Sequence, residues 1–279
     1  MAILNWYVDS VLTQAQDYRG NQLLAKNISS KGYHAIIAEY VYVTPTDIQK
    51  ILCALPGAWE AFHGKGIDLG GGVACISSTI AQKSSVENII CVEVTEEVVK
   101  LCQPIVKAEI LGPNQHKVIS CIGNFNRLEL EPNSLDFAVA WGSLHHSYQL
   151  VDTLVECRRV LKPEGLLVVI ERAHDNSTPE AEINRMLNIE YDEAFLTRTY
   201  RDPEMVLTRR DNGEHEYRYA EWAGAFDSAG FQIQSVRVIR AGPEPSGSSN
   251  DARIPEAYVK AQLGGYLSSK VGYVLSASK

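Results

Sequence analysis

The sequence of 279 residues predicts an α/β fold, in which a doubly wound, largely parallel sheet is covered by helices on both faces. Five short apolar runs alternate with amphipathic segments over about 105 residues, an alternation typical of strand–helix–strand units. The first run leads directly into three glycines and then a helical pattern. Because 45% of the residues are hydrophobic and 22% are charged, the composition is that of an ordinary globular protein with a sizeable core.

The first sixty residues are predicted to be helical. Their clearest helix start is Thr44-Pro45-Thr46-Asp47, in which Thr44 can cap the helix, proline suits the first turn and Asp47 adds a carboxylate there. Pro56-Gly57 is expected to end this helix. We therefore divide the chain into a helical region, residues 1–60, and a main domain, residues 61–279.

The sheet begins after this region, where apolar runs and helical patterns alternate. The predicted strands are Ile67–Leu69, Asn88–Val94, Val118–Ile122, Leu135–Trp141 and Leu166–Ile170. The helices between them are expected at Val73–Gln82, Glu96–Ile110 and Leu150–Leu161. Pro104 is expected to kink or split the second of these helices, because it lacks the backbone N–H that the helix interior uses.

The alternation stops after the fifth strand. Residues 174–218 are charged and aromatic, and we interpret them as an insertion over the carboxyl edge of the sheet, with one helix capped at Thr178-Pro179-Glu180. A helix at Tyr219–Ala229, ended by Gly230, then precedes the last part of the chain. That part holds strands Phe231–Ile239 and Val271–Ser276 on either side of a loop, Ala241–Asp251, rich in proline, glycine and serine.

Charge and composition exclude several classes of function. The formal net charge is −8, so the surface repels phosphate backbones and nucleic acid is not an expected partner. The six cysteines form no CxxC pair and have no histidine at ligand spacing, so they are interpreted as reduced core thiols. No signal peptide or run of about 18 apolar residues is present, so no membrane association and a cytoplasmic location are expected.

The most informative motif is the glycine turn Asp68-Leu69-Gly70-Gly71-Gly72 between the first strand and the first helix of the sheet. Glycines let backbone N–H groups approach a ligand at a helix N-terminus, although such a cluster also occurs in plain tight turns. The dinucleotide pattern GxGxxG would need a glycine where Cys75 stands, and no lysine follows as in a phosphate-binding loop. A nicotinamide oxidoreductase and an ATPase are therefore disfavoured.

A second acidic residue points to an adenosine-bearing ligand. Glu93 ends the second strand, twenty-one residues after Gly72. A carboxylate at this place can accept hydrogen bonds from both hydroxyls of a ribose. Asp68, one unit earlier, would attract an amine or another cationic group.

In their order and spacing, these motifs resemble those of the class I S-adenosylmethionine-dependent methyltransferases of the small-molecule type. The resemblance covers about residues 64–173. It rests on the glycine turn, the strand Ile89–Thr95, the pair Gly123-Asn124 with Phe125, the strand Leu135–Trp141, and the run from Leu144-His145-His146 through Glu156 and Arg159 to Val169. Two residues depart from the family pattern, Ala74 and Glu164, each standing where many members carry glycine.

The resemblance implies a Rossmann-like, seven-stranded sheet in the order 3-2-1-4-5-7-6 with the last strand antiparallel, and residues 1–60 as a lid. It implies S-adenosylmethionine as cofactor, with the glycine turn facing its methionine part, Glu93 holding the ribose and Asn124 at the edge of the adenine. The residues that would bind the cofactor are Asp68, Gly70, Gly71, Gly72, Glu93, Val94, Asn124, Phe125, Trp141 and Tyr33.

Methyl transfer mainly requires donor and acceptor to be aligned, and a base where the acceptor is a hydroxyl or amine. His145 and His146, just after the fourth strand, are the candidate catalytic residues, although paired histidines here could also only pack or cap a helix. No metal site is predicted, because acidic residues on an exposed helix are usually solvated; the acidic residues of the insertion are Glu182, Glu190, Asp192 and Glu193.

We therefore expect an enzyme that methylates an oxygen, nitrogen or carbon atom of a small metabolite. The aromatic and basic residues of the insertion suit a sugar or another polar ring-bearing acceptor, and suit the interface of a homodimer equally well. The alternative from another class is a non-catalytic scaffold subunit that binds the same cofactor, because a fold does not by itself imply a function.

Overall fold

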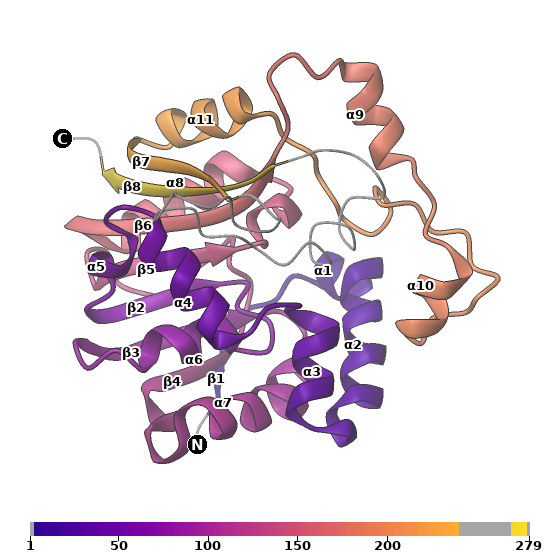
Figure 1. Cartoon of the computed structure of the whole chain (residues 1–279), viewed down its shortest axis with the longest axis horizontal. Coiled ribbons are helices and arrows are strands. Elements are labelled where there is room, and N and C mark those ends of the chain that lie inside the picture. The colour runs from indigo at the N-terminus through magenta and orange to yellow at the C-terminus, as the bar shows by residue number, and fades with distance from the viewer. Residues whose placement is uncertain (1–2, 240–268, 278–279) are drawn as a thin grey trace, which may run out of the picture.

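The computed structural model of the chain describes residues 3–239 and 269–277. Within them, eight strands form one sheet in the order β1-β4-β3-β2-β5-β6-β8-β7, with helices on both of its faces (Figure 1). The strands are β1 (Leu4–Asn5), β2 (Gly64–Leu69), β3 (Val86–Glu93), β4 (Val118–Ile122), β5 (Leu135–Trp141), β6 (Leu161–Ala173), β7 (Phe231–Ile239) and β8 (Ser269–Ala277).

The predicted strand order is confirmed. Strands β2 to β8 follow the order 3-2-1-4-5-7-6, and β8 runs antiparallel to both β6 and β7. The predicted number of seven strands is wrong by one, because β1 adds a short parallel strand at the edge of β4, with Leu4 beside Cys121. A strand of two residues has no periodic pattern, so no signal for it could be found in the sequence.

The helices fall close to their predicted places. They are α1 (Ser10–Gln14), α2 (Gln16–Ile28), α3 (Tyr33–Tyr40), α4 (Pro45–Ala54), α5 (Ala58–Ala61), α6 (Cys75–Ala81), α7 (Gln103–Leu111), α8 (Leu150–Val160), α9 (Glu180–Leu187), α10 (Glu193–Arg198) and α11 (Tyr219–Ser228). The helix expected from Glu96 is split, as Pro104 predicted: a π-helical turn, Val98–Cys102, precedes α7.

The sheet separates two apolar cores, and β5 at its centre shows how. Phe137 and Val139 point into the core beneath the helices α2 to α7, whereas Ala138 and Ala140 point into the core beneath α8 and α11. Alternate residues of a strand face opposite sides of a sheet, so a strand covered on both sides is apolar throughout. This is the doubly wound arrangement that the sequence predicted.

Two helix starts were predicted, and they differ in outcome. At α4, the Thr44 hydroxyl accepts a hydrogen bond from the backbone N–H of Asp47, and the Asp47 carboxylate accepts one from the backbone N–H of Thr44. These two bonds make a complete capping box. At α9 the expected cap is wrong, because the helix begins at Glu180 after Pro179 and no side chain caps it. Thr178 lies one residue too early, so its hydroxyl does not satisfy the first N–H groups.

Three further expectations concern single segments. The six cysteines are all free thiols, but Cys53 is exposed and only the other five are buried as predicted. The predicted loop Ala241–Asp251 lies outside the described residues. None of the helices in the described ranges combines the length and the apolar character needed to cross a membrane.

The parallel strands end at one edge of the sheet, which faces α1, α2, α3 and the insertion (Figure 1). Because β8 is antiparallel, its first residues return to this same edge, where Lys270 pairs in register with Arg172 of β6. Side chains from the ends of β2, β3, β5 and β6, and from the start of β8, therefore meet there. The candidate site lies at this edge, as is general for open α/β sheets.

Candidate active site

The glycine turn after β2 forms the floor of a first cavity. Gly70 and Gly72 have φ of +70° and +50°, a left-handed conformation that favours glycine, and Ala74 at the start of α6 has φ of +65°. A Cβ on Gly70 would lie 2.7 Å from Ser143 and one on Gly71 only 2.4 Å from the Cys91 sulfur. At Gly72, in contrast, no atom lies within 4 Å of the Cβ position, so this glycine leaves room for a ligand.

Two carboxylates stand beside this turn. Asp68 is buried and accepts a hydrogen bond of 2.5 Å from the Ser77 hydroxyl, yet burial raises its pKa to about 6. Glu93 accepts a bond of 2.8 Å from the backbone N–H of Thr95, and burial raises the pKa of its carboxyl group as well. A carboxylate whose ionised form is disfavoured by burial gains most from a cationic group or a hydroxyl that hydrogen-bonds to it.

The first cavity has a volume of about 280 Å³ and gathers eight of the ten residues predicted to bind a cofactor. These eight are Asp68, Gly70, Gly71, Gly72, Glu93, Val94, Phe125 and Trp141. They come from the ends of β2, β3 and β5 and from the loop after β4. The sequence placed them together because the carboxyl ends of parallel strands share one edge.

The other two predicted residues do not line this cavity. Asn124 uses its side-chain oxygen locally, accepting from the backbone and the side chain of Asn126 at 2.9 and 2.7 Å. Tyr33, the first residue of α3, packs against the core beneath the helices and makes an edge-on contact with the ring of His34. Tyr40, the last residue of α3, lines the cavity instead.

The helical region supplies one wall of the first cavity through residues that sequence reasoning did not name. Asp17 and Asn21, four residues apart and hence on one face of α2, line it together with Tyr40 and Val41. The Tyr40 hydroxyl donates to the backbone carbonyl of Asn21 at 3.0 Å and so connects α3 to α2. The i, i+4 spacing of two short polar residues was the available signal, but it is common on solvated helices.

His145 is held in a fixed orientation by Glu171, the third residue from the end of β6. The Glu171 carboxylate is fully buried and accepts three hydrogen bonds: from the backbone N–H groups of Ser143 and Leu144, both at 2.7 Å, and from Nδ1 of His145 at 2.8 Å. Burial alone would raise the pKa of Glu171, but His145, Lys270 and Arg172 hold it below its usual value. The ionised carboxylate therefore requires the proton of His145 on Nδ1.

His146 lies beside His145, with 4.2 Å between the ring centroids. Its Nδ1 lies 3.1 Å from the backbone carbonyl of Gly213 and 3.9 Å from a carboxylate oxygen of Asp17. Burial, with the neighbouring His145, lowers the pKa of His146. Together with Gly142, His146 lines both the first cavity and a second, larger one, so the two spaces meet at the histidine pair.

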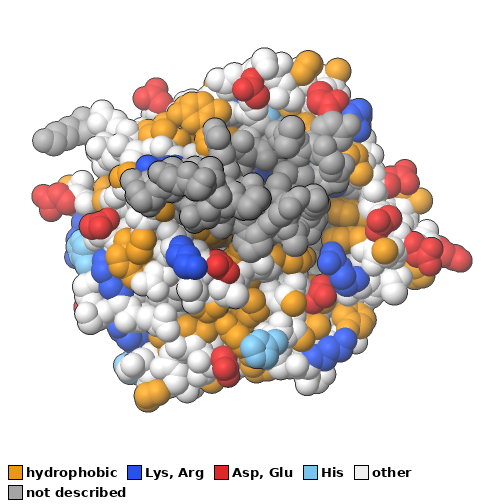
Figure 2. Space-filling model, in the orientation of Figure 1, with side chains coloured by type: hydrophobic (Ala, Val, Ile, Leu, Met, Phe, Trp, Pro, Cys, Tyr) orange, Lys and Arg blue, Asp and Glu red, His pale blue; other side chains and the backbone are white. Residues whose placement is uncertain are grey.

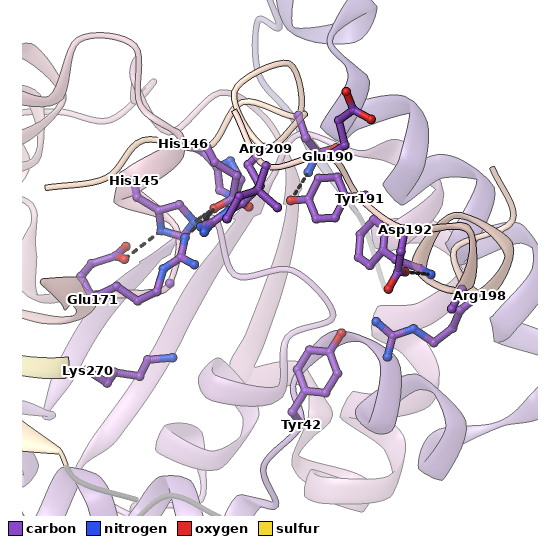
Figure 3. Close-up of a pocket in the computed structure, with 17 residues that line it drawn as sticks. Tyr42, His145, His146, Glu171, Glu190, Tyr191, Asp192, Arg198, Arg209 and Lys270 are labelled. Carbon is purple, nitrogen blue, oxygen red and sulfur yellow. Dashed lines mark hydrogen bonds and ion pairs between the residues drawn. The ribbon is translucent and has the colours of Figure 1, made fainter. Parts of the chain in front are cut away.

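The second cavity has a volume of about 650 Å³ and lies between the sheet edge and the insertion (Figure 3). Both charged and aromatic side chains point into it: Tyr42, His145, His146, Glu171, Arg172, Glu190, Tyr191, Asp192, Phe195, Arg198, Arg209, Glu214 and Lys270. Tyr42, Arg198 and Lys270 stand across the space from the histidines (Figure 3). Burial lowers the pKa of Lys270 to about 7.

A network of buried charges fixes the insertion to β6. Nη2 of Arg172 lies 2.5 Å from a Glu214 oxygen, and Arg209 pairs with Glu216, which also accepts from His174 at 2.6 Å. Burial alone would raise the pKa of Glu214, but Arg172, His145, His146 and Arg209 hold it well below its usual range. Glu171 and Arg172, adjacent in sequence, thus have different partners: His145 for the first, Glu214 for the second.

Four acidic residues of the insertion, two of them in α9 and α10 and two between these helices, stand apart from this network. Red side chains project from the edge of the molecule that the insertion forms (Figure 2). Glu190, Asp192 and Glu193 are exposed, and Glu182 forms an ion pair of 2.8 Å with Arg185. Glu190 and Asp192 also border the second cavity, and Asp192 accepts from the backbone N–H of Phe195 at 2.7 Å, whereas Glu182 and Glu193 have the contacts of a solvated surface.

Comparison with known proteins was made by sequence and by structure. Residues 67–169 match the family model described as a methyltransferase domain. No curated protein matches the chain. The matched segment runs from β2 to β6 and contains the glycine turn, Glu93 and the histidine pair.

Solved structures of low sequence identity share the fold. A geranyl diphosphate methyltransferase in complex with S-adenosylmethionine has a TM-score of 0.58 at 15% identity, over 88% of this chain and 89% of that one. A methyltransferase from Leishmania major that depends on S-adenosylmethionine has a TM-score of 0.57 at 13% identity, and the match covers 97% of this chain and 87% of that one. A mitomycin 7-O-methyltransferase has a TM-score of 0.55 at 13% identity, and the match covers 96% of this chain and 62% of that one.

Proposed function

Since residues 67–169 match the family model of a methyltransferase domain, and a methyltransferase solved with S-adenosylmethionine shares the fold, we propose that the chain transfers a methyl group from S-adenosylmethionine to a small molecule. The acceptor atom is an oxygen, nitrogen or carbon, and the acceptor occupies the second cavity. One observation carries this proposal: the cavity on the glycine turn shares His146 and Gly142 with a larger polar cavity, so the two spaces adjoin. A donor and an acceptor can thus meet end to end, out of bulk water.

The residues of the first cavity fit S-adenosylmethionine. The open Cβ position at Gly72 admits the methionine part, and the Asp68 carboxylate suits its ammonium group. Glu93 can accept from the ribose hydroxyls, while Val94 and Phe125 offer apolar surface to the adenine. When bound, this cofactor supplies an electrophilic methyl group on a sulfonium.

The second cavity suits a polar acceptor that carries a ring. Tyr191 and Phe195 stack on one another, with 4.1 Å between centroids, and present aromatic surface. Arg198, Arg209 and Lys270 add hydrogen-bond donors around it. A sugar or another hydroxylated ring could use both kinds of contact.

The histidine pair is proposed to act on the acceptor's proton. Glu171 fixes Nδ1 of His145 as the protonated nitrogen, so Nε2 carries a lone pair toward the second cavity. A hydroxyl or amine must lose its proton as it is methylated, and these imidazoles stand where the cavities join. Glu171 acts as a positioning residue through His145.

The first test is calorimetric titration with S-adenosylmethionine and S-adenosylhomocysteine, with NAD as the control ligand. We expect micromolar binding of the first two and none of NAD. Glu93→Ala should weaken binding by about 1 to 3 kcal/mol, because the ribose loses its acceptor. The matched control is Glu87→Ala, on the same strand but exposed beside Lys65.

Methyl transfer itself is then tested with a metabolite mixture and cofactor labelled on the methyl group. Transfer of the label to a small-molecule product, together with loss of this transfer in His145→Ala, would support the proposed enzyme. Binding of the cofactor without any label transfer would favour the non-catalytic scaffold, and absence of binding to both S-adenosyl compounds would overturn the proposal.

A further inference from the structure

The two histidines can act on an acceptor hydroxyl by taking its proton, or by holding a metal ion that acidifies it. His145, His146 and Glu214 each offer one ligand atom, and these three atoms lie within 4.8 Å of one another. Nε2 of His145 lies 3.6 Å from a Glu214 oxygen. We propose that this trio binds one divalent first-row transition metal ion at the junction of the two cavities, an inference whose chemical role rests on the proposed function.

The first argument is the tautomer of both histidines. Nδ1 of His145 faces the ionised Glu171 carboxylate at 2.8 Å, and Nδ1 of His146 faces the Gly213 carbonyl at 3.1 Å. Neither acceptor carries a hydrogen, so each Nδ1 must be the donor. In a neutral ring Nε2 then keeps its lone pair. Histidines that bind metal almost always show this arrangement, with the second nitrogen donating to a carboxylate or a carbonyl.

The third ligand is likewise held in place. A Glu214 oxygen accepts from Arg172 at 2.5 Å and lies 3.5 Å from Arg209, so its carboxylate has a fixed orientation. Ligating carboxylates are commonly hydrogen-bonded in this way by residues behind them. Glu214 arrives from the insertion and the histidines from the end of β5, so the trio forms only in the folded chain.

The balance of charge also favours a cation. Among the described residues that contact the trio or its partners, four carboxylates face two guanidinium groups; they are Asp17, Glu171, Glu214 and Glu216 against Arg172 and Arg209. Counting Lys270 in full, as a cation whose charge acts on Glu171, still leaves four carboxylates against three cations. With neutral imidazoles the cluster is negative, and a divalent ion would neutralise it.

The donor set indicates the kind of ion. Two imidazoles and one carboxylate suit zinc, iron, cobalt or nickel better than magnesium or calcium, which prefer oxygen ligands. Three protein ligands leave positions open, and all three line the second cavity, while His146 also lines the first. An acceptor hydroxyl bound there would become more acidic, since a metal ion lowers the pKa of a coordinated oxygen group.

The test is titration of the chelator-treated, full-length protein with Co²⁺, followed by its visible absorption and by calorimetry, with Zn²⁺ as competitor. We expect one Co²⁺ per chain, displaced by Zn²⁺ but not by Mg²⁺. His146→Ala should weaken binding at least about 100-fold, and Glu171→Gln, which touches His145 from behind, about tenfold.

The matched control is His116→Ala. His116 is exposed and its Nδ1 also faces a backbone carbonyl, that of Pro113 at 3.1 Å, but it belongs to no such ligand trio. This variant should bind Co²⁺ as the unmodified chain does. Absence of Co²⁺ binding, or equal binding by His146→Ala, would overturn the metal site.

The same samples are titrated with S-adenosylhomocysteine, which separates this inference from the proposed function. Cofactor binding without metal binding would support the proposed methyltransferase, with His145 as a direct base, and would contradict the metal site. Metal binding without cofactor binding would support the metal site and contradict the proposed methyltransferase.

Discussion

The three glycines of the turn serve different physical purposes. Gly70 and Gly71 lack space for a Cβ, because Ser143 and the sulfur of Cys91 lie too near. Gly72 has that space, but its φ of +50° is one that side chains rarely adopt. Among the three, only Gly72 therefore combines a backbone conformation that would strain any other residue with room that a ligand would fill.

Gly72→Val should abolish cofactor binding by placing a branched side chain in the first cavity. We expect S-adenosylhomocysteine affinity to fall by at least about 2 kcal/mol in calorimetry. The control is Gly112→Val at the end of α7, where φ is +52° and the Cβ position is equally open. Both variants should lose about 1 to 3 kcal/mol of folding stability through strain. If both bind the cofactor equally well, the turn does not hold it.

Asp68 makes cofactor binding depend on pH. Burial raises its pKa to about 6, so the carboxylate is protonated at pH 5 and ionised at pH 7.5. A ligand ammonium prefers the ionised form, and affinity should therefore rise about tenfold between these values. Asp68→Asn should remove that dependence, whereas Asp136→Asn, on the neighbouring strand, should keep it. Calorimetry at both pH values would contradict this expectation if Asp68→Asn retained the rise.

At the scale of elements, the insertion is joined to β6 by buried charges. Glu216 contacts Arg209 and Arg172 and accepts from His174 at 2.6 Å. Such a network contributes little net free energy, because burying each charge costs about as much as pairing it returns. Removing one member, however, leaves a buried charge without its counterion.

Glu216→Gln should therefore lower the free energy of unfolding by about 3 kcal/mol at pH 7. Burial alone would raise the pKa of Glu216, but Arg172, His174 and Arg209 lower it to about 2. This stabilisation is present above the ordinary glutamate pKa and is lost as pH falls toward 2. Urea unfolding between pH 2.5 and 7 measures both effects.

The control for that measurement is Glu190→Gln, an exposed glutamate of the same insertion. Its unfolding free energy should stay within about 0.5 kcal/mol of the unmodified chain. Equal stability of the two variants would mean that the buried network does not fasten the insertion.

At the scale of the whole molecule, residues 1–60 were predicted to be a lid, and this stays a prediction. The region is not uniform: α2, α3 and α4 all bury residues in the core beneath the helices, but of these three only α2 and α3 also line the first cavity, through Asp17, Asn21 and Tyr40. We propose that α1, α2 and α3 cover the cofactor, while α4 serves as fixed structure.

Hydrogen exchange with and without S-adenosylhomocysteine tests this proposal. Amides of α2 and α3 should exchange more slowly when the ligand is bound, because closure suppresses local opening. Amides of α4 should be unchanged and act as the internal control. Equal slowing of all three helices, or of none, would contradict a lid limited to α1, α2 and α3.

The sequence by itself determined the buried strands of the sheet and the edge where its functional residues meet, while the strand order and the cofactor were implied by the family resemblance. Alternating apolar runs specify buried strands, and chain order then places Asp68, Glu93 and Trp141 at one edge, since parallel strands end together. The family resemblance, carried by the same motifs, is confirmed by the match over residues 67–169. The two-residue strand β1 was missed because it has no period to detect.

Only the tertiary structure decided which distant side chains complete the site. Glu214 meets the histidines although it follows them by nearly a quarter of the chain, Lys270 arrives through an antiparallel strand, and Tyr40 rather than Tyr33 faces the first cavity. These contacts follow from how a helix turns and where an insertion folds back. Local periodicity encodes neither, because both depend on packing between segments far apart in the sequence.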